Sequence, residues 1–236
     1  MMNIHGPSLG IGAGISVISI LAAFFALNAL VVPDQPLVLV EANDRDVEAE
    51  RFSVAILTAN GSPYLGDKNA PITLVEFGDY QCFFCNKFFH DTENGILENY
   101  VKTGKVKIIF KDYTIIGPDS ITAALGANCA GDQGKFWEFH DILYNNWNGE
   151  NNGWASSENV KGFATELNLD VDKFTTCLDD EHHKQKIEAS VSDARQLGLT
   201  GTPAFFVINA NNQVTPIKGA QPYEVFQRIF DAELQK

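Results

Sequence analysis

Two cysteines separated by two residues, Cys82 and Cys85, follow an apolar run, Ile72–Phe77, and precede a stretch with helical character. Thiols at this spacing can close a small disulfide ring. If the first thiol lies at a helix N-terminus, unpaired N–H groups and the helix dipole lower its pKa and favour the thiolate, the species that attacks disulfides. The pair is therefore a candidate redox centre, with a structural disulfide and half of a zinc site as alternatives.

The two other cysteines, Cys129 and Cys177, make the total even. There is no second C-x-x-C, and the five histidines are not spaced with the cysteines as zinc-finger ligands are. Neither a metal nor a cofactor is expected. In an exported chain, two pairs of cysteines favour one catalytic disulfide, Cys82–Cys85, and one structural disulfide, Cys129–Cys177. Two independent buried thiols at Cys129 and Cys177 are the alternative.

Composition and charge restrict the class of partner. The chain has 236 residues, of which 45% are hydrophobic and 20% charged, as in an ordinary globular protein. The formal net charge of −13 excludes nucleic acid and anionic membrane surfaces as partners, because no basic patch could offset phosphate repulsion.

The first 33 residues contain no Asp, Glu, Lys or Arg, and residues 11–32 are apolar except for two serines and one asparagine. At about 1.5 Å per residue this run spans the roughly 30 Å core of a bilayer. It is either a cleaved signal peptide, which would leave a secreted protein, or a retained transmembrane anchor. The length of the run, the lack of a basic n-region and the lack of an A-x-A site favour the anchor. We expect a single-pass protein of the cell membrane with its disulfide-using domain on the extracytoplasmic side.

The rest of the chain divides into an acidic tether, residues 34–63, and a globular domain, residues 64–236. The tether contains an Asn60-Gly61-Ser62 sequon for N-glycosylation. The domain begins as strand, helix, strand, with the second strand at Val106–Lys111. A helical block at about 114–198 follows, in which Glu181–Leu197 is expected to be the longest helix. A strand hairpin from Ala204 and a final helix then complete an α/β fold.

Three segments resemble the DsbA-like thiol-disulfide oxidoreductases of the thioredoxin superfamily: Tyr64–Cys85, Gly134–His140 and Gly201–Val207. They occur in the order typical of that family, and the resemblance covers residues 64–235. It implies a thioredoxin-like fold with an inserted helical domain, and extracytoplasmic disulfide exchange. One feature departs from the family: Phe83-Phe84 stands between the cysteines, where the strongest oxidant of the family has a thiolate-stabilising histidine. The helix N-terminus then remains the main stabiliser of a Cys82 thiolate.

Each candidate residue has an expected role. Cys82, at the turn and exposed, is the nucleophile, and Cys85, one helical turn later and more buried, resolves the mixed disulfide. The resemblance implies that Pro203 is cis and faces the disulfide, so that substrate backbone can lie alongside Thr202; a trans proline opening a strand is the alternative. Glu76 corresponds to a buried acidic group that exchanges protons with Cys85, unless it is a solvated carboxylate at a strand edge.

The preferred function is disulfide formation in exported, cysteine-containing proteins by a monomeric enzyme. The resemblance implies a membrane redox partner, linked to quinone, that recycles the active site. A reductase or isomerase of the same fold is one alternative, although residues 34–63 are too few for the dimerisation domain of an isomerase. A thiol-based chaperone or metallochaperone without turnover is the other, but the chain has no Met-rich or His-rich stretch.

Overall fold

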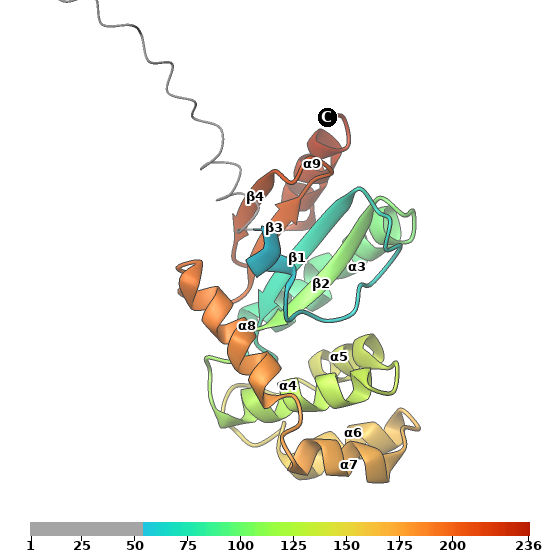
Figure 1. Cartoon of the computed structure of the whole chain (residues 1–236), viewed down its shortest axis with the longest axis vertical. Helices are drawn as coiled ribbons and strands as arrows, with labels where there is room; N and C mark the ends of the chain where they lie inside the picture. The colour runs from blue at the N-terminus through green and yellow to red at the C-terminus, as the bar shows by residue number, and fades with distance from the viewer. Residues whose placement is uncertain (1–53) are drawn as a thin grey trace, which may run out of the picture. The chain divides into compact units, whose positions relative to one another are not determined.

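The structure is a computed structural model that describes residues 54–236. Its centre is a four-stranded sheet with the strand order β2-β1-β3-β4 (Figure 1). The strands are β1 (Ile72–Gly78), β2 (Val106–Asp112), β3 (Ala204–Ile208) and β4 (Val214–Lys218). Strand β1 pairs in parallel with β2 and antiparallel with β3, which forms a hairpin with β4.

One long helical segment connects β1 to β2. It alternates between α-helical and π-helical turns, which are α2 (Phe83–Phe88), η1 (Phe89–Glu93), α3 (Asn94–Ile96) and η2 (Leu97–Val101). Parallel strands require such a crossover, and a helix is its usual form. The C-x-x-C pair therefore lies at the first strand-to-helix turn of a βαβ unit.

Five helices are inserted between β2 and β3, and α9 (Tyr223–Glu233) ends the fold. The inserted helices are α4 (Pro118–Gly131), α5 (Phe136–Asn145), α6 (Ser157–Glu166), α7 (Val171–Asp179) and α8 (Lys184–Gln196). Helices α4 to α7 form a group beyond one end of the sheet, and α8 leads back to it (Figure 1). The side chains of Ser156 and Asp170 cap α6 and α7 by accepting hydrogen bonds from Asn159 N and Lys173 N.

The two faces of the sheet are covered by different elements, as the alternation along β1 requires. Ile72 and Leu74 pack with the crossover helix and α9. Val75 and Phe77 pack with Leu57 and with Ala194 of α8. Glu76 follows Leu74 by two residues, so the pleat directs it to the face that carries the crossover helix.

The predicted fold class is confirmed: the structure has the strand, helix, strand unit, the helical insertion and the final hairpin with its helix. One helix boundary was wrong. The helix expected at Glu181–Leu197 is α8, and it begins only at Lys184 because Glu181 takes a left-handed conformation (φ 48°) in the preceding turn. With 13 residues it is shorter than α4, which has 14.

Residues 54–63, expected to belong to the tether, pack on the domain. Residues 54–58 are helical and bury Leu57 completely. Ser62 N donates to the carbonyl of Phe110 at 2.8 Å, and Trp137 Nε1 donates to the carbonyl of Pro63 at 3.0 Å. The boundary placed after residue 63 therefore falls inside the folded domain, because these contacts join residues too distant in sequence to be foreseen.

The anchor expected at residues 1–33 and the tether up to residue 53 lie outside the described residues. No helix within residues 54–236 has the length and apolar character needed to cross a membrane.

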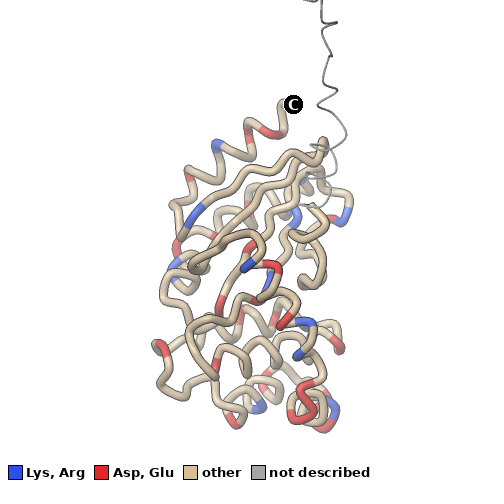
Figure 2. The backbone as a smooth tube through the Cα atoms, turned by 60° about the vertical axis from the view of Figure 1, so that its left-hand side comes forward, with Lys and Arg blue, Asp and Glu red and all other residues tan. Residues whose placement is uncertain are grey.

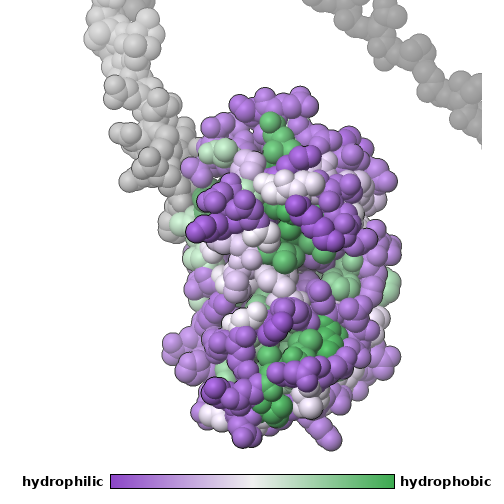
Figure 3. Space-filling view, turned by 90° about the vertical axis from the view of Figure 1, so that its right-hand side faces the viewer, coloured by the Kyte–Doolittle hydropathy of each residue, from purple (hydrophilic) through white to green (hydrophobic). Residues whose placement is uncertain are grey.

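The surface of the described domain carries mixed charge. Lys and Arg are scattered among Asp and Glu along the backbone in Figure 2. On the face in Figure 3, hydrophobic residues form clusters between hydrophilic ones.

Candidate active site

A network of hydrogen bonds from a buried turn positions the C-x-x-C pair. The carboxylate of Asp79, just after β1, accepts from Gln81 N at 2.9 Å and from the N–H groups of Ile115 and Ile116 at 2.8 and 3.0 Å. The carbonyl of Asp79 accepts from Cys82 N at 3.0 Å. Cys82 is the N-cap of α2, with extended backbone angles (φ −67°, ψ 123°). The turn thus directs Cys82 to the N-terminus of the helix.

Gln81 connects this turn to the helical insertion. Its side chain donates to Ser120 Oγ at 3.0 Å and accepts from Asn151 N at 2.7 Å. Its carbonyl accepts from Trp147 Nε1 at 2.8 Å. Gln81, Asp79 and Trp147 were not among the predicted site residues. For Gln81 and Asp79 the only signal in the sequence is their position beside the cysteines, and the helical spacing of Trp147 with other aromatic residues indicates only packing.

The two thiols have opposite environments. Both are free, and Cys85 is completely buried, while 5% of Cys82 is exposed. Cys82 is less exposed than expected because the loop before β3 lies against it: its Sγ is 3.4 Å from the carbonyl oxygen of Thr202. A hydrogen bond from the Cys85 thiol, assisted by Thr202 and by backbone N–H groups of α2, lowers the pKa of Cys82 to about 6. Burial, followed by the neighbouring Cys82, raises the pKa of Cys85 well above its ordinary value.

The loop before β3 provides the opposite wall of the site. The Thr202–Pro203 peptide bond is cis, and Gly219 N donates to the carbonyl of Pro203 at 3.0 Å. The Thr202 hydroxyl is buried and has no hydrogen-bond partner within residues 54–236. A cavity of about 250 Å³ lies along this loop, lined by residues 198–204 with Lys218 and Gly219. The hydroxyl is thus available to a thiolate on Cys82.

Glu76 is the charged residue of β1, and it is 3% exposed. It pairs across the sheet with Phe110 and Phe205. Burial raises its pKa well above the ordinary value, and the negative charges of Glu93 and Cys82 add to this effect. Glu76 is therefore a buried carboxyl close to the thiols, rather than a solvated carboxylate at a strand edge.

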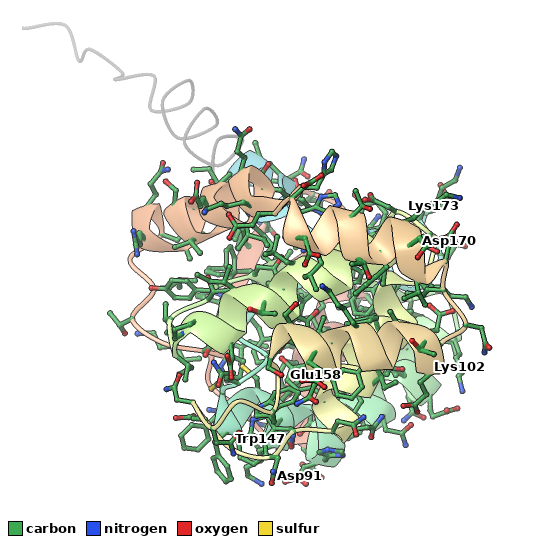
Figure 4. All side chains as sticks on the ribbon, turned by 90° about the horizontal axis from the view of Figure 1, so that it is seen from below. Asp91, Lys102, Trp147, Glu158, Asp170 and Lys173 are labelled. Carbon is green, nitrogen blue, oxygen red and sulfur yellow. A yellow bond between two sulfur atoms is a disulfide. The ribbon has the colours of Figure 1, made fainter. Side chains whose placement is uncertain are left out.

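Aromatic side chains surround the exposed side of the pair. Phe83 and Phe84 are 50% and 56% exposed, and their rings meet edge to face at 5.3 Å. The ring of Phe83 also lies 5.9 Å from that of Trp147, which Figure 4 shows at the periphery of the domain. The carboxylate of Glu150 accepts from Phe83 N at 3.1 Å, so one N–H of the helix N-terminus is occupied. The site thus opens to solvent beside an apolar surface.

The other two cysteines form a disulfide. Cys129 of α4 is bonded to Cys177 of α7, with a Cα–Cα distance of 5.9 Å and a sequence separation of 48. Within the described residues, a group of three side chains that could bind a metal consists of these two cysteines and His183. Since both sulfur atoms belong to the disulfide, neither is a thiolate ligand.

Comparisons with known proteins identify relatives of this chain. A family model described as thioredoxin matches residues 58–232. The chain is 30% identical over 176 residues to the probable disulfide bond formation protein D of Bacillus anthracis, covering 73% of this chain and 78% of that protein. It is 33% identical over 144 residues to the Na(+)/H(+) antiporter NhaA 1 of Salinispora arenicola (strain CNS-205), but this match covers 60% of the chain and 21% of the antiporter.

Two solved structures have the same fold. Oxidised BdbD from Bacillus subtilis superimposes with a TM-score of 0.67 at 27% identity, covering 74% of this chain and 94% of BdbD. Wolbachia pipientis α-DsbA1 gives a TM-score of 0.65 at 26% identity, covering 74% and 90%. The chain belongs to the thioredoxin family, as a thiol-disulfide oxidoreductase of the DsbA-like class.

Proposed function

We propose that this enzyme forms disulfides in exported proteins, with Cys82 and Cys85 as its reactive pair. The observation that carries the proposal is the contrast between the two thiols: the pKa of Cys82 is lowered to about 6, while burial raises that of Cys85. A thiol of low pKa is a good leaving group in disulfide exchange. Cys82 is therefore the sulfur that a substrate attacks and that departs afterwards.

The exchange runs in two steps. A substrate thiolate attacks Cys82 Sγ of the oxidised pair, the Cys82–Cys85 bond breaks, and its electrons pass to Cys85, which takes up a proton. A second substrate thiolate then attacks the substrate sulfur of the mixed disulfide, and Cys82 leaves as a thiolate. The substrate loses two electrons and gains a disulfide, and the enzyme ends with a thiolate on Cys82 and a thiol on Cys85.

The surrounding residues have separate roles in this proposal. Substrate backbone lies along Thr202, because Pro203 has no N–H that would need a partner. The Thr202 hydroxyl has no hydrogen-bond partner within the described domain while Cys82 is a thiol, and it donates to Cys82 once the thiolate forms. Phe83 and Phe84, both half exposed, contact apolar side chains of the substrate. Glu76 supplies the proton to Cys85. The burial of Glu76 and its raised pKa support this role.

The proposal includes a location and a recycling partner. We expect the apolar run within residues 1–33 to anchor the enzyme, with a tether ending before residue 54 and the catalytic domain on the extracytoplasmic side. A membrane redox partner would reoxidise the pair. The names of relatives, such as the disulfide bond formation protein D of Bacillus anthracis, support the direction of exchange.

The test is the reduction potential of the pair in glutathione buffers, with thiols quantified by alkylation and mass. A value of about −120 to −180 mV supports disulfide donation, whereas about −270 mV would reassign the enzyme as a reductase. Cys85→Ser should form a stable mixed disulfide when its Cys82 thiolate attacks a disulfide-containing peptide and the other peptide sulfur leaves as a thiolate, and Cys82→Ser should not. Full activity of Cys82→Ser would contradict the proposal and favour a binding or chaperone function.

A further inference from the structure

Five polar atoms without a protein hydrogen-bond partner gather on the inner side of the active site. Within residues 54–236, these buried atoms are Tyr80 OH, Glu93 Oε2, Asp112 Oδ1, His140 Nε2 and Tyr144 OH. The ring of His140 lies 5.7 Å from that of Tyr80 and 5.0 Å from that of Tyr144, and the two tyrosine rings are 5.2 Å apart. Buried polar groups that lack protein partners are usually satisfied by ordered water. These five atoms are therefore the candidates for contact with internal water.

The cluster adjoins the reactive pair through Glu76 and Glu93. Glu93 lies on the crossover helix that carries Cys85 in its first turn, and it is 3% exposed. The charge of Glu93 raises the pKa of Glu76, so the two carboxyls are close neighbours. Cys85 in turn is close enough for Glu76 to raise its pKa. Cys85 and Glu93 of the crossover helix and Glu76 on the sheet face beneath it are therefore buried acidic groups within electrostatic range of one another.

The groups that face Glu93 come from three elements. They are Glu76 of β1, Tyr80 of the following turn, and His140 and Asp141 of α5. Burial raises the pKa of Glu93; the nearby His140 opposes the effect and Asp141 adds to it. Two carboxyls that are buried together do not both ionise readily, and so the pair holds a proton near neutral pH.

His140 connects the cluster to solvent. Its ring is 1% exposed and is packed among the rings of Tyr80, Phe110 and Tyr144. One ring nitrogen, Nδ1, is 3.2 Å from Asp141 Oδ1, and the side chain of Asp141 is 56% exposed. The other nitrogen, Nε2, belongs to the unpartnered set. The imidazole of His140 therefore contacts a surface carboxylate through Nδ1, and its Nε2 faces the protein interior without a protein partner.

We propose that Glu93 and His140, with internal water, form a proton-transfer path between Glu76 and Asp141 that supplies and removes the proton of Cys85. The inference rests on the proposed function of the Cys82–Cys85 pair. When substrate opens the disulfide, Cys85 takes a proton from Glu76. Glu93 replaces that proton, and one from solvent enters through Asp141 and His140. When the pair is reoxidised, one proton travels the opposite way as Cys85 attacks the mixed disulfide on Cys82.

The test compares Glu93→Gln with Glu98→Gln, an exposed position on the same helix. Both variants are prepared as the oxidised protein and mixed rapidly with a dithiol peptide in H2O and in D2O, from pH 5 to 8. Because Glu76 still carries a proton in Glu93→Gln, we expect a loss of about tenfold in the rate of Cys85 thiol formation, below the roughly 10²–10⁴-fold of a general acid itself. The solvent isotope effect should increase, and the pH profile should flatten.

A second variant separates proton transfer from packing. His140→Phe keeps a ring among the surrounding aromatic residues but removes both nitrogens. It should show the same loss as Glu93→Gln, and the double variant should lose no more than either one, because both act on one path. The absorbance of the Cys82 thiolate and the thermal unfolding of each variant are measured alongside.

The outcomes distinguish the two proposals. If Glu93→Gln matches Glu98→Gln in rate, isotope effect and pH profile while the wild type reacts through Cys82, the path is refuted and the proposed function stands. If the loss is independent of pH and isotope, Glu93 is merely structural and the path is again refuted. If the wild type itself shows no reaction that depends on Cys82, the proposed function fails.

Discussion

The reduction potential of the Cys82–Cys85 pair should change its pH dependence near pH 6. Since the pKa of Cys82 is lowered to about 6 and that of Cys85 is raised, the reduced pair carries two protons below pH 6 and one above it. For a two-electron couple, two protons correspond to a fall of about 59 mV per pH unit and one proton to about 30 mV. The plot of potential against pH should therefore become half as steep above pH 6.

The direction of the shift in reduction potential follows from which form of the enzyme is charged. Above pH 6 ionisation of Cys82 stabilises the reduced enzyme, so the pair is a stronger oxidant than one whose thiols both stay protonated. At pH 7 the thiolate outnumbers the thiol by about ten to one, which corresponds to a potential about 30 mV higher. Below pH 5 the advantage disappears, because Cys82 is then protonated like an ordinary thiol.

The assay equilibrates the enzyme in thiol-disulfide buffers at intervals of half a pH unit from 5 to 8. Acid quenching, alkylation and mass measurement then give the fraction reduced. The ultraviolet absorbance of the thiolate in the reduced enzyme, less that of the oxidised enzyme, reports the pKa of Cys82 independently. A single slope of about 59 mV through pH 8 would refute the reasoning, since Cys82 would then remain a thiol throughout.

Three further variants test parts of the same structure. Thr202→Val should move the break in that plot upward by about one pH unit, because a hydrogen bond to a charged group is lost. Replacing Cys129 and Cys177 by Ala should lower the unfolding free energy, measured in urea, by about 4 kcal/mol, from a 48-residue closure. Asp193→Asn should cost about 3 kcal/mol in the same measurement, since it leaves the buried Lys111 ammonium, 2.6 Å from Asp193 Oδ2, without its counter-charge.

The elements of the sheet were predictable from local pattern. Mostly apolar runs indicated β1, β2 and β3, and the cysteines between the first strand and its helix indicated the turn that carries the site. The start of α8 was not predictable, because nothing in the local sequence indicates that Glu181 takes a left-handed conformation. Nor was the packing of residues 54–63, which depends on contacts with β2 and α5.

The residues of the candidate site also divide into those that could be predicted from the sequence and those that could not. Cys82 and Cys85 could be selected from their spacing behind a strand, and Glu76 and Pro203 from the resemblance to the DsbA-like oxidoreductases. Glu93 could not, since a glutamate on a helix is usually exposed and only the folded structure shows that this one is buried. Gln81 was missed for a similar reason: its partners are 39 and 70 residues away.

The route of the chain makes the reactivity of Cys82 dependent on the completion of folding. The carbonyl of Thr202 that contacts Cys82 Sγ is 120 residues later in the sequence, and β3 pairs with β1 across the whole helical insertion. Pairings of such large sequence separation form slowly. A nascent or partly folded copy would therefore lack one wall of its active site, and Cys82 would lack the assistance of Thr202, although the larger contribution of Cys85 comes from only three residues away. The full acidity of the most reactive sulfur is thus reached only when one of the last contacts has formed.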